Sequence, residues 1–375
     1  MNVAIVISRL SNGGLERVQS HLAHAFAQRG IHTAVAAGVI VHRHAGDFPP
    51  EVPVVEIASA GRLAFAPGLL NFLRRTRPDC VFTTSNDVAC MAVAMKRLFF
   101  PQLRVVVTQH LSLSGPLGHS SGWQQTKLRI VRAIMRLLLR HADAFVAVTN
   151  QVANDLADEI GLDRRRIHVI HNPIIGSDFA SRLDERPPVY LWGAGETPTI
   201  VYAGRLAPEK RLDLLLDAFS ELLTRRQARL LIVGDGPERT ALEQRICLAP
   251  LSGRCMISGF VDNVFPLIAA SDVLVLPSDY EGFGNVLVEA MACGVQVVAT
   301  DCPHGPREIL EDGHYGQLVP TGDAAALLEA IERVLTGEAR IEPELLRTRA
   351  RQFGVDRAAD EYVSLMRDVI AAPAG

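Results

Sequence analysis

Two acidic residues around a glycine loop give the sequence its clearest candidate for a ligand site. Glu281 precedes a Gly-Phe-Gly loop and Glu289 follows it, both within the segment DYEGFGNVLVEAMACG at residues 279–294. Glycines let backbone N–H groups approach a ligand closely, and the helix expected to begin near Asn285 presents unpaired donors at its N-terminus. The two carboxylates can then accept hydrogen bonds from vicinal hydroxyls, one pair on a hexose and one on a ribose. The plainer alternative is a loop acid followed by a solvated acid near a helix start.

Two basic residues form a second candidate. Arg205 and Lys210 lie on one turn, after an apolar run at residues 199–203 and before a helical pattern at residues 212–223. Two cations fixed on such a turn can neutralise a diphosphate, including the charge that develops on a departing nucleoside diphosphate in a transition state. Taken alone, the same residues also fit a solvated basic turn.

Two further loops in the second half of the chain also follow apolar runs. Gly234 and Asp235 lie in LLIVGDGPE at residues 230–238, where Asp235 either accepts hydrogen bonds from a ligand or caps the turn. His304 and Glu308 lie in DCPHGPRE at residues 301–308 and are candidates for supporting the site or contacting an acceptor.

The first half of the chain carries weaker signals. Gly13 and Gly14 follow an apolar run at residues 3–8 and open a helical pattern, and His110 follows another run at residues 104–108. A glycine pair permits close approach of a ligand, whereas a lone histidine is more often structural. The chain contains no GxxxxGK, no GxGxxG with a suitable acid after it and no HExxH, which argues against kinase, dehydrogenase and metalloprotease chemistry.

The loops all follow short runs rich in Val, Ile and Leu that alternate with longer helical patterns. This alternation predicts parallel strands covered by helices on both faces, an α/β fold. Strands are expected at residues 3–8, 33–37, 52–57, 80–83, 104–108, 144–148 and 167–170, and again at 199–203, 229–233, 255–257, 273–276 and 295–299. Residues 184–198 are rich in Pro and Gly and are typical of a linker between two doubly wound domains. Because ligands gather beyond the carboxyl ends of such strands, we expect the site in an interdomain cleft.

Composition narrows the class of protein. The chain has 375 residues, 48% of them apolar and 21% charged, with a formal net charge of −3. These values are typical of globular domains and give no reason to expect nucleic-acid binding. The six cysteines contain no CxxC pair, which argues against a zinc site or a disulfide framework. No secretory leader or membrane span is recognisable, so we expect a cytoplasmic protein.

One segment predicts a partner. Residues 127–141 contain five basic residues and no acid, with Leu128, Val131, Ile134, Met135 and Leu138 at helical spacing. At about 100° per residue, four arginines fall on one side of this helix, opposite the apolar stripe; they are Arg129, Arg132, Arg136 and Arg140. Such a face can meet the anionic headgroups of a membrane surface. The alternative is a surface helix with solvated arginines.

Taken together, these segments resemble the retaining glycosyltransferases of family 4, which have the two-domain GT-B fold. The resemblance covers nearly the whole chain, from Gly13-Gly14 through HNP at residues 171–173 and the Gly-Phe pair at residues 259–260. Its most specific parts are the two glutamates in EGFGNVLVEAMACG and the pair Arg205 and Lys210.

The resemblance implies a role for each matching residue. Arg205 and Lys210 would hold the donor diphosphate, Glu281 the transferred sugar, and His110 would reach that sugar from the other domain. The implied donor-binding residues are Gly13, Gly14, Gly234, Phe260, Val261, Phe283, Gly284, Asn285, Val286 and Glu289, with Glu289 on the ribose. No bound metal or other cofactor is implied. The implied domains are an N-terminal one at residues 1–184, a donor-binding one at residues 185–355, and a final helix at residues 356–375 that crosses back to the first.

The activity implied by the resemblance is transfer of a hexose or N-acetylhexosamine to a glycan or lipid-linked glycan, with retention by front-face attack. A UDP-sugar is favoured over GDP-mannose as donor. Two alternatives remain open at this stage. One is a sugar-nucleotide epimerase of the same architecture, and the other is a non-catalytic subunit that binds a sugar nucleotide.

Overall fold

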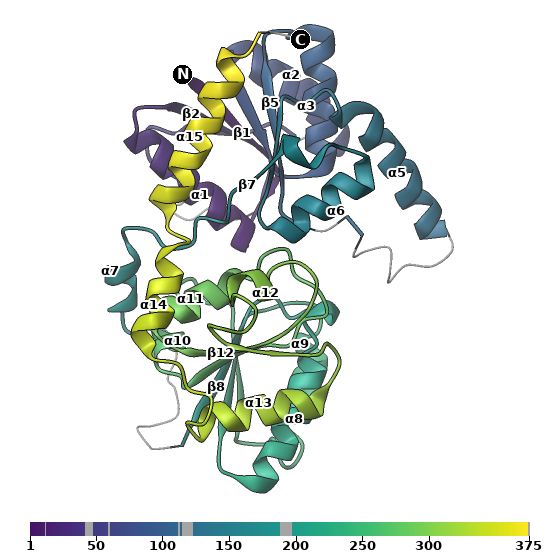
Figure 1. Ribbon diagram of the computed structural model, residues 1–375. Coiled ribbons are helices and arrows are strands. Elements are labelled where there is room, and N and C mark those ends of the chain that lie inside the picture. The colour runs from purple at the N-terminus through teal and green to yellow at the C-terminus, as the bar shows by residue number, and fades with distance from the viewer. Residues whose placement is uncertain are drawn as a thin grey trace. The chain divides into compact units, whose positions relative to one another are not determined.

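The computed structural model describes residues 1–11, 13–41, 48–58, 61–111, 113–114, 123–187 and 197–373. The chain forms two compact units (Figure 1). Unit 1 comprises Met1–Ile174 and Val355–Gly375, and unit 2 comprises Ile175–Gly354.

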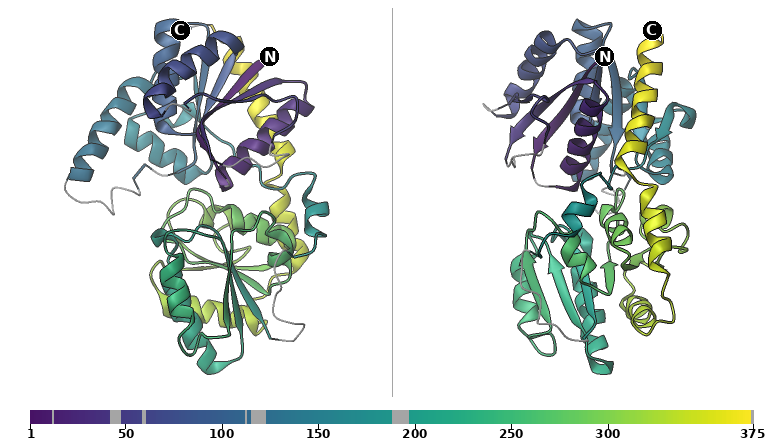
Figure 2. Two further views of the ribbon diagram at one scale, coloured as in Figure 1. Left: turned by 180° about the vertical axis from the view of Figure 1, so that it is seen from behind. Right: turned by 90° about the vertical axis from the view of Figure 1, so that its left-hand side faces the viewer.

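Unit 1 is built on a parallel sheet in the order β3-β2-β1-β4-β5-β6-β7. Its strands are β1 (Asn2–Leu10), β2 (His32–Ile40), β3 (Val54–Glu56), β4 (Cys80–Thr83), β5 (Arg104–Gln109), β6 (Ala144–Ala147) and β7 (Ile167–Val169). Helices cover both faces (Figure 2): α1 (Gly14–Gln28), α2 (Phe65–Thr76), α3 (Asn86–Phe99), α5 (Trp123–Leu139), α6 (Asn150–Ile160) and α15 (Val355–Ala371). Every residue of β4, β5 and β6 is buried, as expected for strands between two helical layers.

Unit 2 repeats this architecture with the strand order β10-β9-β8-β11-β12-β13, again all parallel. Its strands are β8 (Thr199–Ala203), β9 (Arg229–Val233), β10 (Cys255–Gly259), β11 (Val273–Leu276), β12 (Gln296–Thr300) and β13 (Gln317–Val319). Its helices are α7 (Phe179–Leu183), α8 (Leu212–Arg225), α9 (Arg239–Ile246), α10 (Phe265–Ala269), α11 (Asn285–Cys293), α12 (Pro306–Ile309), α13 (Ala324–Leu335) and α14 (Pro343–Arg351). The predicted fold class, two Rossmann-like doubly wound domains, is confirmed.

Every strand predicted from the sequence is present, with ends that differ by a few residues. The strand β13 was not predicted, because it is a short edge strand of mixed burial and leaves no apolar run. Part of the predicted linker at residues 184–198 lies outside the described residues.

The compact units divide earlier in the chain than the linker composition indicates. Unit 2 begins at Ile175 because α7 packs against α10. The ring of Phe179 lies edge-on to that of Phe265, with centroids 5.0 Å apart, and the guanidinium of Arg182 lies 5.3 Å from the same ring. The amide of Asn263 also donates to the Arg182 carbonyl oxygen at 2.6 Å. These contacts attach α7 to the second sheet, so its residues fold with unit 2.

The last helix returns to unit 1. Figure 1 shows α15 running along the first sheet, where it packs on α1. Tyr362 is buried with its ring 5.4 Å from Phe82 and 6.4 Å from Phe26, both in edge-on contacts. At the surface, Arg29 forms ion pairs with Asp356 at 3.1 Å and Asp360 at 2.8 Å. The buried ring therefore fixes α15 to the core, because exposed ion pairs contribute less than about 1 kcal/mol each.

The helix α5 differs from the prediction made for it. Met135 and Leu139 are buried, but Val131 and Ile134, which belong to the predicted apolar stripe, are 42% and 48% exposed. Arg132, predicted on an arginine face open to solvent, is largely covered and forms an ion pair with Glu159 at 2.5 Å. That part of the helix prediction is wrong, because the strip of α5 that packs within unit 1 includes Arg132 and leaves Val131 and Ile134 exposed. The side chains of Lys127 and Leu128 lie outside the described residues. Among the described residues, no helix has the length and hydropathy required to cross a bilayer.

We predict that Tyr362→Ala lowers the free energy of unfolding of unit 1 by about 3–5 kcal/mol, the usual cost of removing a large buried aromatic side chain. Tyr362→Phe keeps the ring contacts and serves as the matched control, with a smaller loss. Denaturant unfolding followed by peptide-resolved hydrogen exchange measures both effects. An alanine variant with wild-type stability, or with faster exchange confined to unit 2, would show that α15 is not part of the unit 1 core.

Candidate active site

The loops that carry the candidate residues of unit 2 meet at one edge of its sheet. They follow β8, β9, β10, β11 and β12, and the carboxyl ends of parallel strands share one edge. Backbone hydrogen bonds join them directly: Gly204 N–H donates to Val233 O at 2.9 Å, and Gly234 N–H donates to Gly259 O at 2.8 Å. The N–H of Asp279 donates to Glu209 O at 2.8 Å. The sequence-distant loops therefore form one continuous surface.

An ion pair between Lys210 and Glu281 lies in this surface. The Lys210 Nζ is 2.6 Å from Glu281 Oε1, and the two side chains are 19% and 10% exposed. Ser278, which is fully buried, donates its Oγ hydrogen to the same oxygen at 2.7 Å. Both donors use Oε1, and within the described part of the chain Oε2 accepts no hydrogen bond. The pair thus leaves two Lys210 N–H groups and one Glu281 oxygen for a ligand.

The turn that carries Lys210 is held from two sides. At its start the buried hydroxyl of Tyr202 donates to the Arg205 carbonyl oxygen at 2.8 Å. At its end Arg211 adopts a left-handed conformation with φ 49°, and its guanidinium bonds Asp279 at 3.1 Å and Asp213 at 3.0 Å. Lys210 therefore lies between two anchors that fix it opposite Glu281.

Arg205 lies on the same turn as Lys210 but is more exposed to solvent. Its side chain is exposed, and it forms no ion pair with the residues that the structure describes. An exposed guanidinium presents donors to an anionic ligand without first breaking an internal contact. The structure thus brings the two predicted cations onto one turn.

Two glycines permit the close approach of these loops. A Cβ atom at Gly234, which has φ 140°, would lie 1.9 Å from the Gly204 carbonyl oxygen. A Cβ at Gly305, which has φ 133°, would lie 2.0 Å from the Phe283 carbonyl oxygen. Neither position accepts a side chain without moving backbone.

The helix α11 begins at this surface. Gly284 is its N-cap residue with φ 95°, and Asn285 is its first residue, followed by the half-buried Val286. Phe283 is buried, and its ring lies 5.7 Å from that of Phe353 in an edge-on contact. Glu289 lies within α11 and is 7% exposed.

The other predicted residues of unit 2 lie in three loops, after β10, after β9 and before α12. Phe260 is 48% exposed and Val261 is buried, directly after β10. Asp235 accepts a hydrogen bond from Gly236 N–H at 2.7 Å and pairs with Arg239 at 2.8 Å, which supports its role as a turn cap. His304 adopts a left-handed conformation with φ 68°, in the loop before α12.

A cysteine also lies close to the ion pair. Burial, followed by the negative charge of Glu281, raises the pKa of the Cys302 thiol to about 12. The thiol therefore stays protonated at neutral pH and is a poor nucleophile.

Three predicted residues lie in unit 1. Gly13 is the N-cap residue of α1 and Gly14 is its first residue, with the Ser11 hydroxyl donating to Glu16 Oε1 at 2.6 Å beside them. His110 follows β5 and is 9% exposed, and neither ring nitrogen meets hydrogen-bond criteria with any residue in the described ranges. Burial lowers the pKa of His110 to about 4, and a weaker interaction with the Asn172 side chain acts in the opposite direction.

Sequence reasoning missed the residues that support the pair. Ser278, Arg211 and Asp279 hold Glu281 and Lys210 in place, yet none of them was predicted to have a role, although Asp279 is the first residue of the segment at residues 279–294. Asp279 lies after β11, directly before Tyr280 and Glu281. This position is the sequence feature from which its role could have been predicted.

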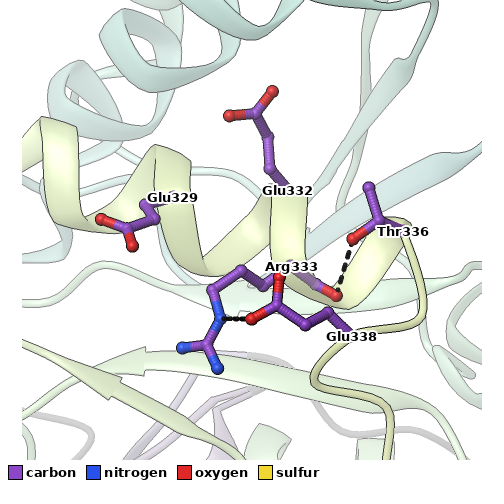
Figure 3. A pocket seen from close by; sticks show the side chains of 5 residues that line it. All are labelled: Glu329, Glu332, Arg333, Thr336 and Glu338. Carbon is purple, nitrogen blue, oxygen red and sulfur yellow. Dashed lines mark hydrogen bonds and ion pairs between the residues drawn. The ribbon is translucent and has the colours of Figure 1, made fainter.

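A surface hollow elsewhere in unit 2 shares no residue with this site. It is lined by Glu329, Glu332, Arg333, Thr336 and Glu338, on and just after α13 (Figure 3). Arg333 is paired with Glu338 at 2.8 Å, and Glu332 with Arg225 at 2.8 Å. Two of its three carboxylates, Glu332 and Glu338, are thus already ion-paired within the protein, and the hollow lacks the glycine loops of the sheet edge.

Both halves of the chain match known families of glycosyltransferases. Residues 12–175 match the profile of Glycosyltransferase Family 4, and residues 197–337 match that of Glycosyl transferases group 1. The chain is 31% identical over 270 residues to a 2-deoxystreptamine glucosyltransferase of Streptomyces kanamyceticus, covering 68% of this chain and 67% of that protein. It is 29% identical over 249 residues to an alpha-D-kanosaminyltransferase of the same organism, and there it spans only 62% of the relative's length.

Other relatives match along nearly the whole chain. An N-acetylgalactosamine-N,N'-diacetylbacillosaminyl-diphospho-undecaprenol 4-alpha-N-acetylgalactosaminyltransferase of Campylobacter jejuni is 24% identical over 378 residues, 98% of each protein. The crystal structure of Anabaena Alr3699/HepE in complex with UDP-glucose superposes with a TM-score of 0.77 at 21% identity, covering 98% of this chain and 100% of that one. The chain belongs to glycosyltransferase family 4 and has the GT-B fold of two Rossmann-like domains.

Proposed function

We propose that the protein is a retaining glycosyltransferase that moves a hexose or N-acetylhexosamine from a UDP-sugar to a glycan or lipid-linked glycan. The observation that carries the proposal is the Lys210–Glu281 pair at the carboxyl-end edge of the unit 2 sheet, with Arg205 exposed on the same turn. Such an arrangement offers cations to a diphosphate and a carboxylate oxygen to a sugar hydroxyl within one surface.

The proposed roles follow from what each side chain has left to offer. Lys210 uses one of its three N–H donors on Glu281, so the others can bond phosphate oxygens, and Arg205 adds its guanidinium from the same turn. Glu281 accepts a hydrogen bond from a sugar hydroxyl at Oε2. The backbone N–H groups of Gly284 and Asn285, at the N-terminus of α11, donate hydrogen bonds to the sugar or to a phosphate. Glu289 takes the ribose hydroxyls.

The remaining predicted donor contacts are part of the same proposal. Gly234 lets the β9 loop approach the nucleotide, Phe260 and Val261 lie near the base, and Gly13 and Gly14 of unit 1 serve the phosphates or the acceptor. No bound metal takes part.

The proposed reaction requires no protein nucleophile. The bond between C1 of the sugar and the diphosphate oxygen breaks while the acceptor oxygen bonds C1 on the same face. The departing phosphate oxygen takes the proton of the acceptor hydroxyl, which balances the charges. Lys210 and Arg205 stabilise the negative charge that grows on the diphosphate, so their effect falls on the transition state more than on the ground state.

Donor and acceptor are inferred from similar proteins and from the sequence. A solved structure of the same fold holds UDP-glucose, which supports a UDP-sugar. The name of the Campylobacter relative specifies an undecaprenol-linked glycan, which supports a lipid-linked acceptor. A cytoplasmic enzyme that works against the inner membrane surface through the exposed Arg129, Arg136 and Arg140 of α5 is consistent with such an acceptor.

The alternatives make different products. An epimerase converts the donor sugar without an acceptor, and a binding subunit leaves every donor intact. Incubation of a UDP-sugar panel with and without a polyprenyl-linked acceptor separates these cases, and the anomeric configuration of any product tests retention.

We predict that Lys210→Ala lowers kcat by about 100-fold or more, the scale reported for loss of one preorganised electrostatic donor. Arg225→Ala serves as the matched control, because Arg225 is also an ion-paired cation of unit 2 but lies on the exposed side of α8. It should change kcat less than 2-fold, roughly the scatter of a neutral surface substitution. Steady-state kinetics with unfolding curves for both variants decide the matter, and near-normal turnover in a folded Lys210→Ala protein would refute the proposal.

His110 generates a separate prediction about pH. With its pKa near 4 in the folded protein, the ring is neutral at neutral pH and can bond a sugar hydroxyl without carrying charge. Between the unfolded pKa of about 6.5 and the folded value, the unfolded chain binds a proton that the folded chain does not, so stability falls as pH falls.

We expect His110→Gln to flatten this pH dependence of the free energy of unfolding between about pH 6.5 and pH 4. Denaturant unfolding at a series of pH values gives the free energy of unfolding of the variant and of the wild type. Subtracting one from the other at each pH cancels the contribution of all other titratable groups. If the two proteins lose stability in parallel over this range, His110 is not held neutral by burial.

A further inference from the structure

The two passages of the chain between the units, at Ile175 and at Gly354, lie side by side. The chain enters unit 2 at Ile175 and leaves it after Gly354. These two residues form a parallel β-bridge, and the N–H of Ile175 donates to the carbonyl oxygen of Phe353 at 3.3 Å. The backbone of Phe353 thus bonds the segment that enters unit 2 and is itself part of the segment that leaves it.

The side chain of Phe353 contacts the loop that carries Glu281. Phe353 is 3% exposed, and its ring lies 5.7 Å from that of Phe283 with an interplanar angle of 78°. Phe283 comes two residues after Glu281 and directly before Gly284, the N-cap residue of α11. In a close-packed interior, one of two rings in contact cannot shift without disturbing the other. The position of the Glu281 loop therefore depends on Phe353.

Arg349, on α14, adds a second support. Its guanidinium lies 5.1 Å from the ring of Phe353 and 5.4 Å from that of Tyr315. The same guanidinium donates to the carbonyl oxygens of Glu308 at 2.7 Å and Ile309 at 3.0 Å, at the end of α12. Arg349 thereby fixes the end of α12 to the ring of Phe353.

The two supported loops are joined to each other at the candidate site. The N–H of Glu281 donates to the carbonyl oxygen of Pro303 at 3.3 Å. Gly305, the N-cap residue of α12, approaches Phe283 so closely that a Cβ would lie 2.0 Å from the Phe283 carbonyl oxygen. Figure 1 shows α14 beside α11, and the two helices pack together. The loops after β11 and β12 are therefore linked to each other and supported together from the α14 side.

We propose that Phe353 and Arg349 are positioning residues that couple the nucleotide-binding loops of unit 2 to the two passages. Local opening of the backbone at Phe353 breaks its ring contact with Phe283 and loosens the loop that carries Glu281. A nucleotide bound to that loop opposes the opening, because the open form binds it less well. Since such linkage is reciprocal, loosening Phe353 also weakens nucleotide binding. The inference rests on the proposed function, because it takes a nucleoside diphosphate as the ligand of these loops.

Amide hydrogen exchange of the full-length protein, with and without UDP, tests the coupling. The reporters are peptides that cover residues 281–289 in the site, and residues 174–178 and 352–356 at the passages. With UDP at about 100 times its Kd, an opening that abolishes binding becomes about 100-fold rarer. We expect wild-type exchange to slow at least about 10-fold in the site peptide and about 5-fold at both passages, where openings that leave the site intact also contribute.

Two variants remove the coupling contacts and leave Glu281 and Lys210 unchanged. Phe353→Leu keeps an apolar side chain but loses the ring contacts, and Arg349→Gln loses its charged contacts with α12 and the two rings. Each should raise the Kd of UDP about 3–10-fold, the factor that corresponds to one aromatic pair. At UDP concentrations scaled to each Kd, the site peptide should stay protected, while protection at the passages falls below about 2-fold because their openings no longer disturb the site.

Two controls match these substitutions. Phe219→Leu changes a fully buried ring on α8, and Arg351→Gln changes an exposed arginine of α14 that pairs with Glu344 at 2.9 Å. Both should keep the wild-type protection by UDP at the passages, even where Phe219→Leu lowers the free energy of unfolding. A merely structural role of Phe353 would give the same result as Phe219→Leu. Thermal unfolding verifies that each variant is folded.

A double-mutant cycle assigns the effect to the pair of rings. Phe283→Leu combined with Phe353→Leu should raise the Kd of UDP no more than the larger of the two single effects, because either substitution removes the same contact.

Three results would overturn the inference. The first is protection of residues 281–289 by UDP with none at the passages, which leaves the proposed function standing. The second is protection at the passages that is unchanged in both folded variants, or reduced equally in the controls. The third is no protection of either region by UDP, in which case the proposed function fails as well.

Discussion

The pairing of Lys210 with Glu281 is the contact on which the unit 2 site depends. A 2.6 Å bond between largely covered charges is stable only when both ends are held, since each ion loses hydration on burial. Ser278 holds the carboxylate, and the Arg211–Asp279 contact holds the turn that carries the lysine. The protein thus keeps the Lys210 cation neutralised and oriented, with two N–H donors that this pair does not use. Arg205, exposed on the same turn, adds positive charge without this restraint.

The parallel sheet makes that pairing possible. Residues of the β8 turn and of the β11 loop are far apart in the chain, and they meet because parallel strands end at a common edge. Gly234 and Gly305 let the loops approach more closely than any side chain would allow. In unit 1, α1 follows β1 and His110 follows β5, so both also lie beyond the carboxyl ends of parallel strands. On its outer side, α5 carries exposed arginines and aliphatic side chains, on an element separate from the carboxyl-end edge of either sheet.

The sequence predicted the strands well because each buried parallel strand is a compact apolar run, as residues 273–276 show. It predicted Lys210 and Glu281 because their loops follow such runs. It did not predict β13, which has no apolar run, or the support from Ser278 and Arg211, which depends on contacts between distant loops. The exposure of Val131 and Ile134 could not be predicted from the sequence either. Periodicity identifies an apolar stripe on a helix, but it does not show how much of that stripe a neighbouring helix covers.

A crystal structure of the full chain with bound UDP tests the central claim most directly. We expect the diphosphate at the carboxyl-end edge of the unit 2 sheet, with phosphate oxygens at hydrogen-bond distance, about 3 Å, from Lys210 Nζ and the Arg205 guanidinium. The ribose hydroxyls should contact Glu289. A nucleotide bound elsewhere, with Lys210 in contact only with Glu281 and Arg205 still in solvent, would contradict it.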